Sequence, residues 1–164
     1  GPNPPPPPKI STTKINQKMP PQQKIYEAVL DTQQSVIESL KPNILWKDVQ
    51  QLATEKICQH LIDLNIINGN LDDAVTQNSH LPFFPHRVGH TMGLDVHDIN
   101  ISPNTPLQPG MVITIEPGLY FPKHETYQGI GIRIEDDILI TNEGAKNLSK
   151  TAAKTIPDIK HLTS

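Results

Sequence analysis

The stretch Met111-Val112-Ile113-Thr114-Ile115-Glu116-Pro117-Gly118 decides the fold of this sequence. The pair Pro109-Gly110 is a turn signal, and the nonpolar run after it has the length of a buried strand. Counting by two, Val112, Thr114 and Glu116 share one face of that strand. A carboxylate at the end of a buried strand is costly unless it is paired or bound to a metal ion, so Glu116 is the first candidate functional residue.

A second strand is expected downstream. Isoleucines at every second position from 130 to 134 predict a strand with one nonpolar face. Glu135 then falls on the opposite face, together with Gly131 and Arg133. Asp136 falls on the isoleucine face, where we expect it to bulge into the following turn. The nonpolar run Ile138–Ile140 predicts that the sheet continues beyond it.

Two amphipathic helices are expected before these strands, because nonpolar residues recur there at steps of three and four. The first helix begins at Pro20-Pro21 and ends before Pro42, and the second ends near Asn68-Gly69. Their nonpolar stripes are Ile25, Val29, Thr32, Val36 and Leu40 in the first helix, and Val49, Ala53, Ile57, Leu61 and Leu64 in the second. Two helices followed by several strands predict an α+β domain with an antiparallel sheet.

The composition excludes several classes of protein. Among 164 residues, 17 acidic and 14 basic side chains give a net charge of −3, so no nucleic-acid partner is expected. The single cysteine, Cys58, excludes a disulfide scaffold, and we expect it to be a buried small nonpolar residue. No nonpolar run reaches the roughly 18 residues of a membrane span, so no membrane partner is expected either.

Residues 1–20 are rich in proline and carry lysines but no acidic residue. The run Pro4–Pro8 favours the extended polyproline II conformation. We expect a linker or disordered arm that is dispensable for stability, because it offers little nonpolar surface to offset the entropy of ordering. A docking ligand for a proline-binding module is the alternative.

Three histidines, His86, His90 and His97, lie close together in a segment that also contains glycines. On a helix, the spacing of His86 and His90 would suggest a zincin, but that motif requires glutamate where Arg87 stands. On an extended strand, residues i and i+4 share a face, so both imidazoles can point into one site. Histidines on a polar surface are the alternative interpretation.

A metal site is favoured by the histidine cluster together with Glu116 and Glu135. One imidazole and two carboxylates are a suitable ligand set for Mn, Fe, Co or Zn. Thr114 and Arg133 would then lie where they can donate hydrogen bonds to ligand or substrate oxygens. Strand-edge glutamates on the surface are the alternative. The motifs of serine hydrolases, phosphate loops and dinucleotide-binding proteins do not occur.

Three ordered motifs resemble the C-terminal half of a pita-bread metallopeptidase, closest to the Xaa-Pro aminopeptidases and prolidases. They are the histidine segment at residues 85–98, the segment at 107–120 that contains Glu116, and Gly129-Ile130-Gly131-Ile132-Arg133-Ile134-Glu135-Asp136. The form Pro-His-x-Val-Gly-His is most similar to the mitochondrial intermediate-cleaving branch. The resemblance implies a pita-bread half-domain with a curved antiparallel sheet over residues 21–158, a tail at 159–164, and a mitochondrial or cytoplasmic, in either case intracellular, location.

The same resemblance implies a role for each site residue. His90 and Glu116 would bind one metal ion, and Glu135 would bridge two ions. His86 and His97 would contact the peptide substrate, and Arg133 would support the ligands. The implied activity is removal of the N-terminal residue of a peptide, before proline or as an intermediate-cleaving peptidase, by a metal-activated hydroxide. Manganese is the expected metal, with zinc or cobalt as alternatives.

One departure from the family pattern concerns the other half of the site. The family takes two aspartate ligands from a strand hairpin that precedes the first helix, but no aspartate precedes Asp31 here. Asp31 itself is expected on the solvent side of the helix. We therefore expect a fragment, a truncated product or a half-domain that needs an N-terminal half or a second copy, and that binds one ion at most. A catalytically dead peptide-binding or protein-binding module and a prolidase are the alternatives.

Overall fold

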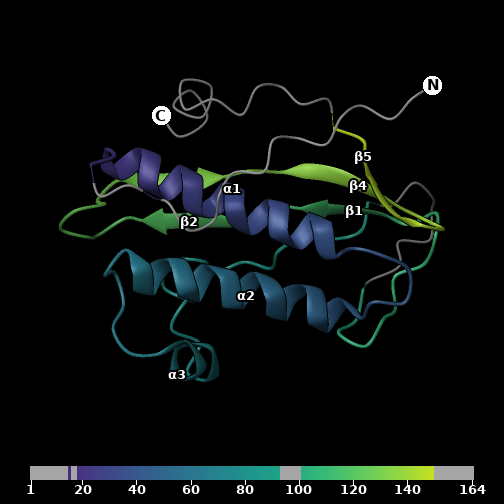
Figure 1. Cartoon of the computed structure of the whole chain (residues 1–164), viewed down its shortest axis with the longest axis horizontal. Coiled ribbons are helices and arrows are strands. Elements are labelled where there is room, and N and C mark those ends of the chain that lie inside the picture. The colour runs from purple at the N-terminus through teal and green to yellow at the C-terminus, as the bar shows by residue number, and fades with distance from the viewer. Residues whose placement is uncertain (1–14, 16–17, 93–100, 150–164) are drawn as a thin grey trace.

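The computed structural model describes residues 15, 18–92 and 101–149 (Figure 1). Within these residues, three helices precede five strands. They are α1 (Pro21–Ser39), α2 (Trp46–Asp63), α3 (Leu71–Thr76), β1 (Val112–Ile115), β2 (Gly118–Phe121), β3 (Ile130–Arg133), β4 (Asp136–Thr141) and β5 (Gly144–Asn147). His97, most of the proline-rich arm and the 159–164 tail lie outside the described residues, so the predictions made for them stay predictions. Ile15, within the arm, packs against the hydrophobic core.

Helix α1 is the central element of the fold. It contacts α2 as well as β1, β2 and β3, and Figure 1 shows it lying along the strands. Proline at the first helical position starts it, where the missing N–H costs nothing. Every residue of the predicted stripe from Ile25 to Leu40 is buried, which confirms that prediction. However, Asp31 and Gln33 are buried as well, so the helix is buried on more than the one face that its periodicity indicates.

Helices α2 and α3 complete the helical part. Four residues of the predicted α2 stripe are fully buried and Leu64 is half-buried, and Cys58 is buried as expected. Helix α3 was not predicted, because six residues are too few to show a helical period. Its start is set by Asn70, whose side chain accepts a hydrogen bond from Asp73 N at 2.9 Å. No helix in the described part of the chain is long and nonpolar enough to cross a membrane.

The strands form two antiparallel ladders. One has the order β1-β4-β5 and the other pairs β2 with β3. The antiparallel prediction is therefore confirmed, but the predicted strand that contains Glu135 is divided. Strand β3 ends at Arg133 and β4 begins at Asp136, which is buried within the ladder and does not bulge into a turn. Asn147 Nδ2 donates a hydrogen bond to Asp136 Oδ2 at 3.2 Å, which compensates part of the cost of burial.

A buried polar cluster joins α1 to α2. Asp31 is only 3% exposed, so the expectation that it faces solvent was wrong. Its Oδ2 atom lies 2.5 Å from His60 Nε2 and 3.2 Å from Lys56 Nζ. Burial alone would raise the pKa of Asp31, but the hydrogen bond and positive charge of His60, together with Lys56, outweigh it and hold this pKa below its usual value.

Replacement of Asp31 by alanine should destabilise the protein by about 3 kcal/mol, because His60 and Lys56 would lose the carboxylate that compensates their burial. Chemical denaturation at pH 7 measures this loss, and Glu38→Ala, an exposed position on the same helix, is the matched control. The pKa of Asp31 is lowered in the folded state, so its contribution is present at neutral pH and is lost as pH falls through the folded value. A difference between wild type and D31A that does not shrink in acid would contradict this assignment.

Candidate metal centre

Glu116 and Glu135 face each other across the gap between the two ladders. The pair Ile115↔Asp136 ends one ladder and the pair Gly118↔Arg133 begins the other, and the residue numbers of both pairs add up to 251. Because the register is continuous, Glu116 lies opposite Glu135. Next to the glutamates, Pro117 and Ile134 form a hydrogen-bonded pair, because Ile134 N donates to Pro117 O at 3.2 Å. Since hydrogen-bonded and non-hydrogen-bonded pairs alternate along an antiparallel ladder, the two glutamates form a non-hydrogen-bonded pair. In such pairs the side chains approach most closely.

Glu116 affects the pKa of Glu135. A hydrogen bond to Glu116, then burial, then the negative charge of Glu116 raise the pKa of Glu135, while the charges of Arg133 and His90 act in the opposite direction. Glu116 Oε2 is buried and has no hydrogen-bond partner among the described residues. Two like charges face to face and an oxygen without a donor are favourable only if a proton or a cation lies between them.

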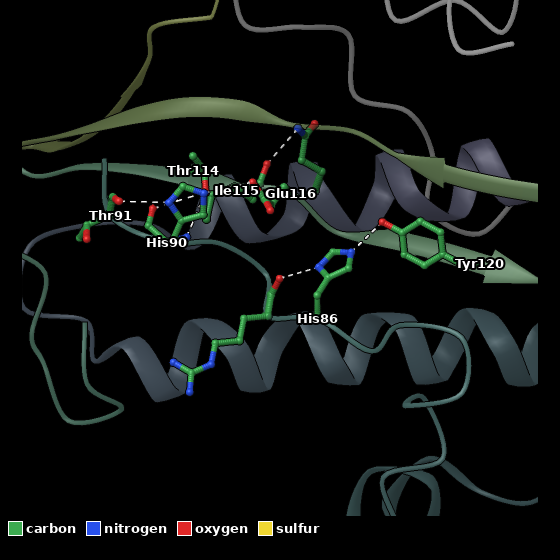
Figure 2. A network of polar contacts seen from close by, with 9 residues as sticks. His86, His90, Thr91, Thr114, Ile115, Glu116 and Tyr120 are labelled. Carbon is green, nitrogen blue, oxygen red and sulfur yellow. Dashed lines mark hydrogen bonds and ion pairs between the residues drawn. The ribbon is translucent and has the colours of Figure 1, made fainter. Parts of the chain in front are cut away.

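The segment from Val88 to Met92 brings a histidine to this pair. It runs antiparallel to β1 along the edge that β4 leaves open: Glu116 N donates to Val88 O, Thr114 N to His90 O, and Met92 N to Val112 O. His90 Nε2 lies 3.7 Å from Glu116 Oε2, too far for a hydrogen bond, and its side chain is 64% exposed. Figure 2 shows the imidazole beside Thr114 and Glu116.

Gly89 permits the close approach of this segment to β1. A Cβ atom at position 89 would lie 1.7 Å from Thr114 O, a distance that no side chain can adopt without a shift of the backbone. The hydrogen bond from His90 N to Thr114 Oγ1, at 3.0 Å, forms directly after this contact. The glycine of the histidine motif therefore sets the position of His90 relative to Glu116.

His86 lies in the same segment but contacts a different partner. Its Nε2 atom is 2.7 Å from the Tyr120 hydroxyl and its Nδ1 atom is 2.8 Å from Arg87 O (Figure 2). Because the backbone carbonyl can only accept, Nδ1 carries a proton, and neutral His86 would accept at Nε2 from the tyrosine. The structure thus places His86 against Tyr120, whose hydroxyl is close enough to Glu116 to be affected by its charge.

Tyr120 is the site residue that the sequence did not reveal. Burial raises the pKa of its hydroxyl, the charge of Arg133 lowers it, the charge of Glu116 raises it, and a hydrogen bond with Arg133 lowers it. A Cβ atom at Gly118 would lie 2.4 Å from the Tyr120 hydroxyl oxygen, so the glycine leaves room for the phenol. In the sequence, Tyr120 is two residues from Gly118, which indicates only that the two residues share one face of a strand. This spacing does not indicate a functional role.

The donor chemistry of the site fits a divalent metal ion. An imidazole, two facing carboxylates and a buried oxygen without a donor match what Mn, Zn or Co would take. Even so, no group of three or more His, Cys, Asp or Glu side chains within residues 15, 18–92 and 101–149 is arranged to hold an ion. The described residues therefore supply donors of the right chemistry but not a complete set of ligands.

Substitution of Gly89 by alanine should displace the His90 segment from β1 and destabilise the protein by about 2–3 kcal/mol, as overpacking against backbone does. Thermal unfolding measures the loss. Gly144→Ala is the matched control, because a Cβ atom there meets nothing closer than 4.0 Å. Equal thermal midpoints for G89A and wild type would show that the segment does not rest on β1.

Replacement of Glu135 by glutamine should stabilise the metal-free protein by up to about 1 kcal/mol at pH 7.5, because it removes the repulsion between facing carboxylates. The pKa of Glu135 is raised, so wild type loses stability as pH rises through that value while E135Q does not. Denaturation in chelator between pH 4 and 8 measures both curves. Parallel curves would show that the two carboxylates do not interact.

Comparisons with known proteins identify the family. The profile of metallopeptidase family M24 matches residues 9–142. The chain is 38% identical over 148 residues to the Xaa-Pro aminopeptidase of Escherichia coli, covering 86% of this chain and 34% of that protein. It is 37% identical to rat Xaa-Pro aminopeptidase 3, covering 88% of this chain and 29% of that protein. This chain thus spans about a third of the length of such relatives.

Solved structures give the same result for the fold. Aminopeptidase P from E. coli with the inhibitor Pro-Leu matches at a TM-score of 0.76 and 38% identity, covering 87% of this chain and 34% of that one. A zinc-substituted form of the E. coli protein in complex with product also matches at 0.76, covering 92% and 35%. The predicted pita-bread fold is therefore confirmed, and this chain belongs to metallopeptidase family M24.

Proposed function

We propose that this chain is the C-terminal part of a metal-dependent aminopeptidase that removes the N-terminal residue of peptides whose second residue is proline. The observation that carries the proposal is the pair of facing glutamates with His90 beside them. Two facing carboxylates, one of which has a buried oxygen without a donor in the described part of the chain, lower the stability of a sheet, so their placement is explained by a positively charged ligand. Relatives named Xaa-Pro aminopeptidase support the substrate class.

His90, Glu116 and Glu135 would hold the metal, with the glutamates as the residues able to contact more than one ion. A divalent ion bound there supplies a Lewis acid and lowers the pKa of water at neutral pH. Glu116 Oε2, which lacks a donor, would bind directly. The positive charge of Arg133 acts against the raised pKa of Glu135 and would favour the ionised form of that carboxylate. Manganese is the ion we propose, and the zinc-substituted relative makes zinc the alternative.

The substrate side of the site would be formed by His86, Tyr120 and His97. His86 Nε2 and the Tyr120 hydroxyl share one hydrogen bond, so the hydroxyl could turn to donate to a peptide carbonyl while Nε2 accepts from a peptide N–H. The bond to Arg87 O fixes the His86 tautomer and therefore leaves Nε2 as the atom that meets substrate. His97 is proposed from the motif alone. The E. coli and rat relatives match this chain almost equally well, at 38% and 37% identity, so the identities do not favour one branch of the family. Membership of the intermediate-cleaving branch is therefore proposed from the histidine motif.

Activity would require residues from outside this chain. The described part of the chain offers no group of three ligands arranged to hold an ion, and the relatives are about three times longer. We therefore propose that a missing N-terminal half, or a second copy, completes the metal centre and the peptide site. The incomplete ligand group is also what a peptide-binding module without turnover would show, and this is the second candidate.

The test compares the chain alone with a fusion in which the remaining two-thirds come from the E. coli relative. The chain alone should bind a single Mn ion weakly by calorimetry and show negligible turnover of an Xaa-Pro peptide. The fusion should hydrolyse the peptide, and Glu135→Gln should lower its kcat/KM by ~100-fold or more, since it removes a metal ligand. Glu125→Gln, an exposed position in the β2–β3 loop, is the matched control.

Each outcome distinguishes the candidates. A well-folded fusion that binds peptide without turnover would support the binding module. Two tight Mn sites and clear turnover in the chain alone would contradict the proposal that the centre is incomplete. Equal effects of E135Q and E125Q would show that the facing glutamates do not form the metal site.

A further inference from the structure

The gap between the two ladders contains a backbone acceptor that the sheet cannot satisfy. Pro117 and Ile134 form a hydrogen-bonded antiparallel pair, in which each residue would normally donate to the other. Ile134 N does donate to Pro117 O, at 3.2 Å. Proline has no N–H, so the reciprocal bond to Ile134 O cannot form. A buried carbonyl without a donor lowers the stability of the fold, so Ile134 O needs another donor, and it lies directly beside the two glutamates.

Gln33 of helix α1 supplies the missing donor. Its Nε2 atom donates to Ile134 O at 3.2 Å and lies 3.5 Å from Ile115 O. The side chain is fully buried, which is rare for glutamine and requires hydrogen bonding. The two carbonyls belong to the residues that immediately precede Glu135 and Glu116. One side-chain amide from the central helix thus reaches the backbone of both strands at the level of the candidate metal centre.

Control of these carbonyls fixes the direction of the glutamates. A peptide group is planar, so the oxygen of residue 134 lies in one plane with the nitrogen and Cα of Glu135. The same holds for Ile115 O and Glu116. An amide donor between the two oxygens therefore restricts rotation of both peptide planes, and with it the separation of the two carboxylates. Catalytic and metal-binding groups need this kind of support from residues that do not touch the ligand.

We propose that Gln33 is a positioning residue that replaces the absent N–H of Pro117 and holds Glu116 and Glu135 face to face for the metal ion. The proposal rests on the proposed function for its metal part only. The replacement of the N–H by the amide stands on the hydrogen bonds and the burial of Gln33 alone. The alternative is that Gln33 contributes to stability like any other buried polar residue of α1.

A double-mutant cycle between Gln33→Leu and Pro117→Ala tests the replacement without metal. Gln33→Leu keeps nearly the same volume but removes the donor, and should raise the unfolding equilibrium constant on the order of tenfold. Alanine at position 117 restores an N–H that can donate to Ile134 O. Gln33→Leu should therefore cost several-fold less in the Pro117→Ala background. Additive effects of the two substitutions would overturn the proposal.

Mn titration of the same variants tests the positioning of the glutamates, and Thr32→Val is the matched control. Thr32 is also fully buried in α1 and donates to a carbonyl, Ala28 O at 2.8 Å, but that carbonyl belongs to its own helix. Well below the unfolding temperature, Gln33→Leu should weaken Mn binding about tenfold. Addition of Pro117→Ala to Gln33→Leu should restore the binding, and Thr32→Val should leave it unchanged. Equal weakening by Q33L and T32V would overturn the positioning role.

The two measurements separate this inference from the proposed function. In one outcome, the effects of Gln33→Leu and Pro117→Ala on stability are coupled, but wild type binds no Mn, either alone or fused to the rest of the E. coli relative. This outcome would support the role of the Gln33 amide in replacing the Pro117 N–H and would overturn the metal site. In the other outcome, wild type binds Mn but the effects of the two substitutions on stability are additive. This outcome would support the proposed function and overturn the role of Gln33.

Discussion

The register of two antiparallel strands forces two carboxylates into contact, and the rest of the structure accommodates that constraint. Glu116 and Glu135 occupy a non-hydrogen-bonded pair, where opposite side chains come closest. The Glu116 side chain is only 15% exposed, and its Oε2 atom has no donor among the described residues. A sheet selected only for stability would place opposite charges or nonpolar side chains there. The local conflict is therefore a sign of function.

Neighbouring elements each hold one part of this arrangement. Gly89 lets the histidine segment lie against β1, so the imidazole arrives from the side that β4 leaves open. Gly118 leaves room for the Tyr120 phenol, which in turn contacts His86. Helix α1 reaches the strand backbone through Gln33 and is itself tied to α2 by Asp31, His60 and Lys56. A change within the helical layer can thus reach the carboxylates through backbone hydrogen bonds, without any contact with a ligand.

The sequence predicted the repeating features well and the interactions between elements poorly. Helical periodicity located both long helices, and alternation located the strands around Glu116 and Glu135, because burial of one face leaves a regular pattern. The motifs also indicated that His86, His90, Glu116, Glu135 and Arg133 belong to one site, although the roles of the first and last as substrate-contacting and supporting residues, and of the other three as metal ligands, remain proposals. The burial of Asp31 and Gln33 could not be foreseen, since their partners are contributed by other elements far along the chain. Tyr120 was missed for the same reason.

The shared register also determines where the chain tolerates a change in length. The loop between β2 and β3 lies beyond the last ladder pair, Phe121↔Ile130, so residues added there leave every pair before it unchanged. One residue inserted between Ile115 and Gly118, or between Arg133 and Asp136, would instead turn one glutamate to the other face of the sheet, because side chains alternate with a period of two. Members of this family should therefore vary in the loop and keep these two short spacings constant.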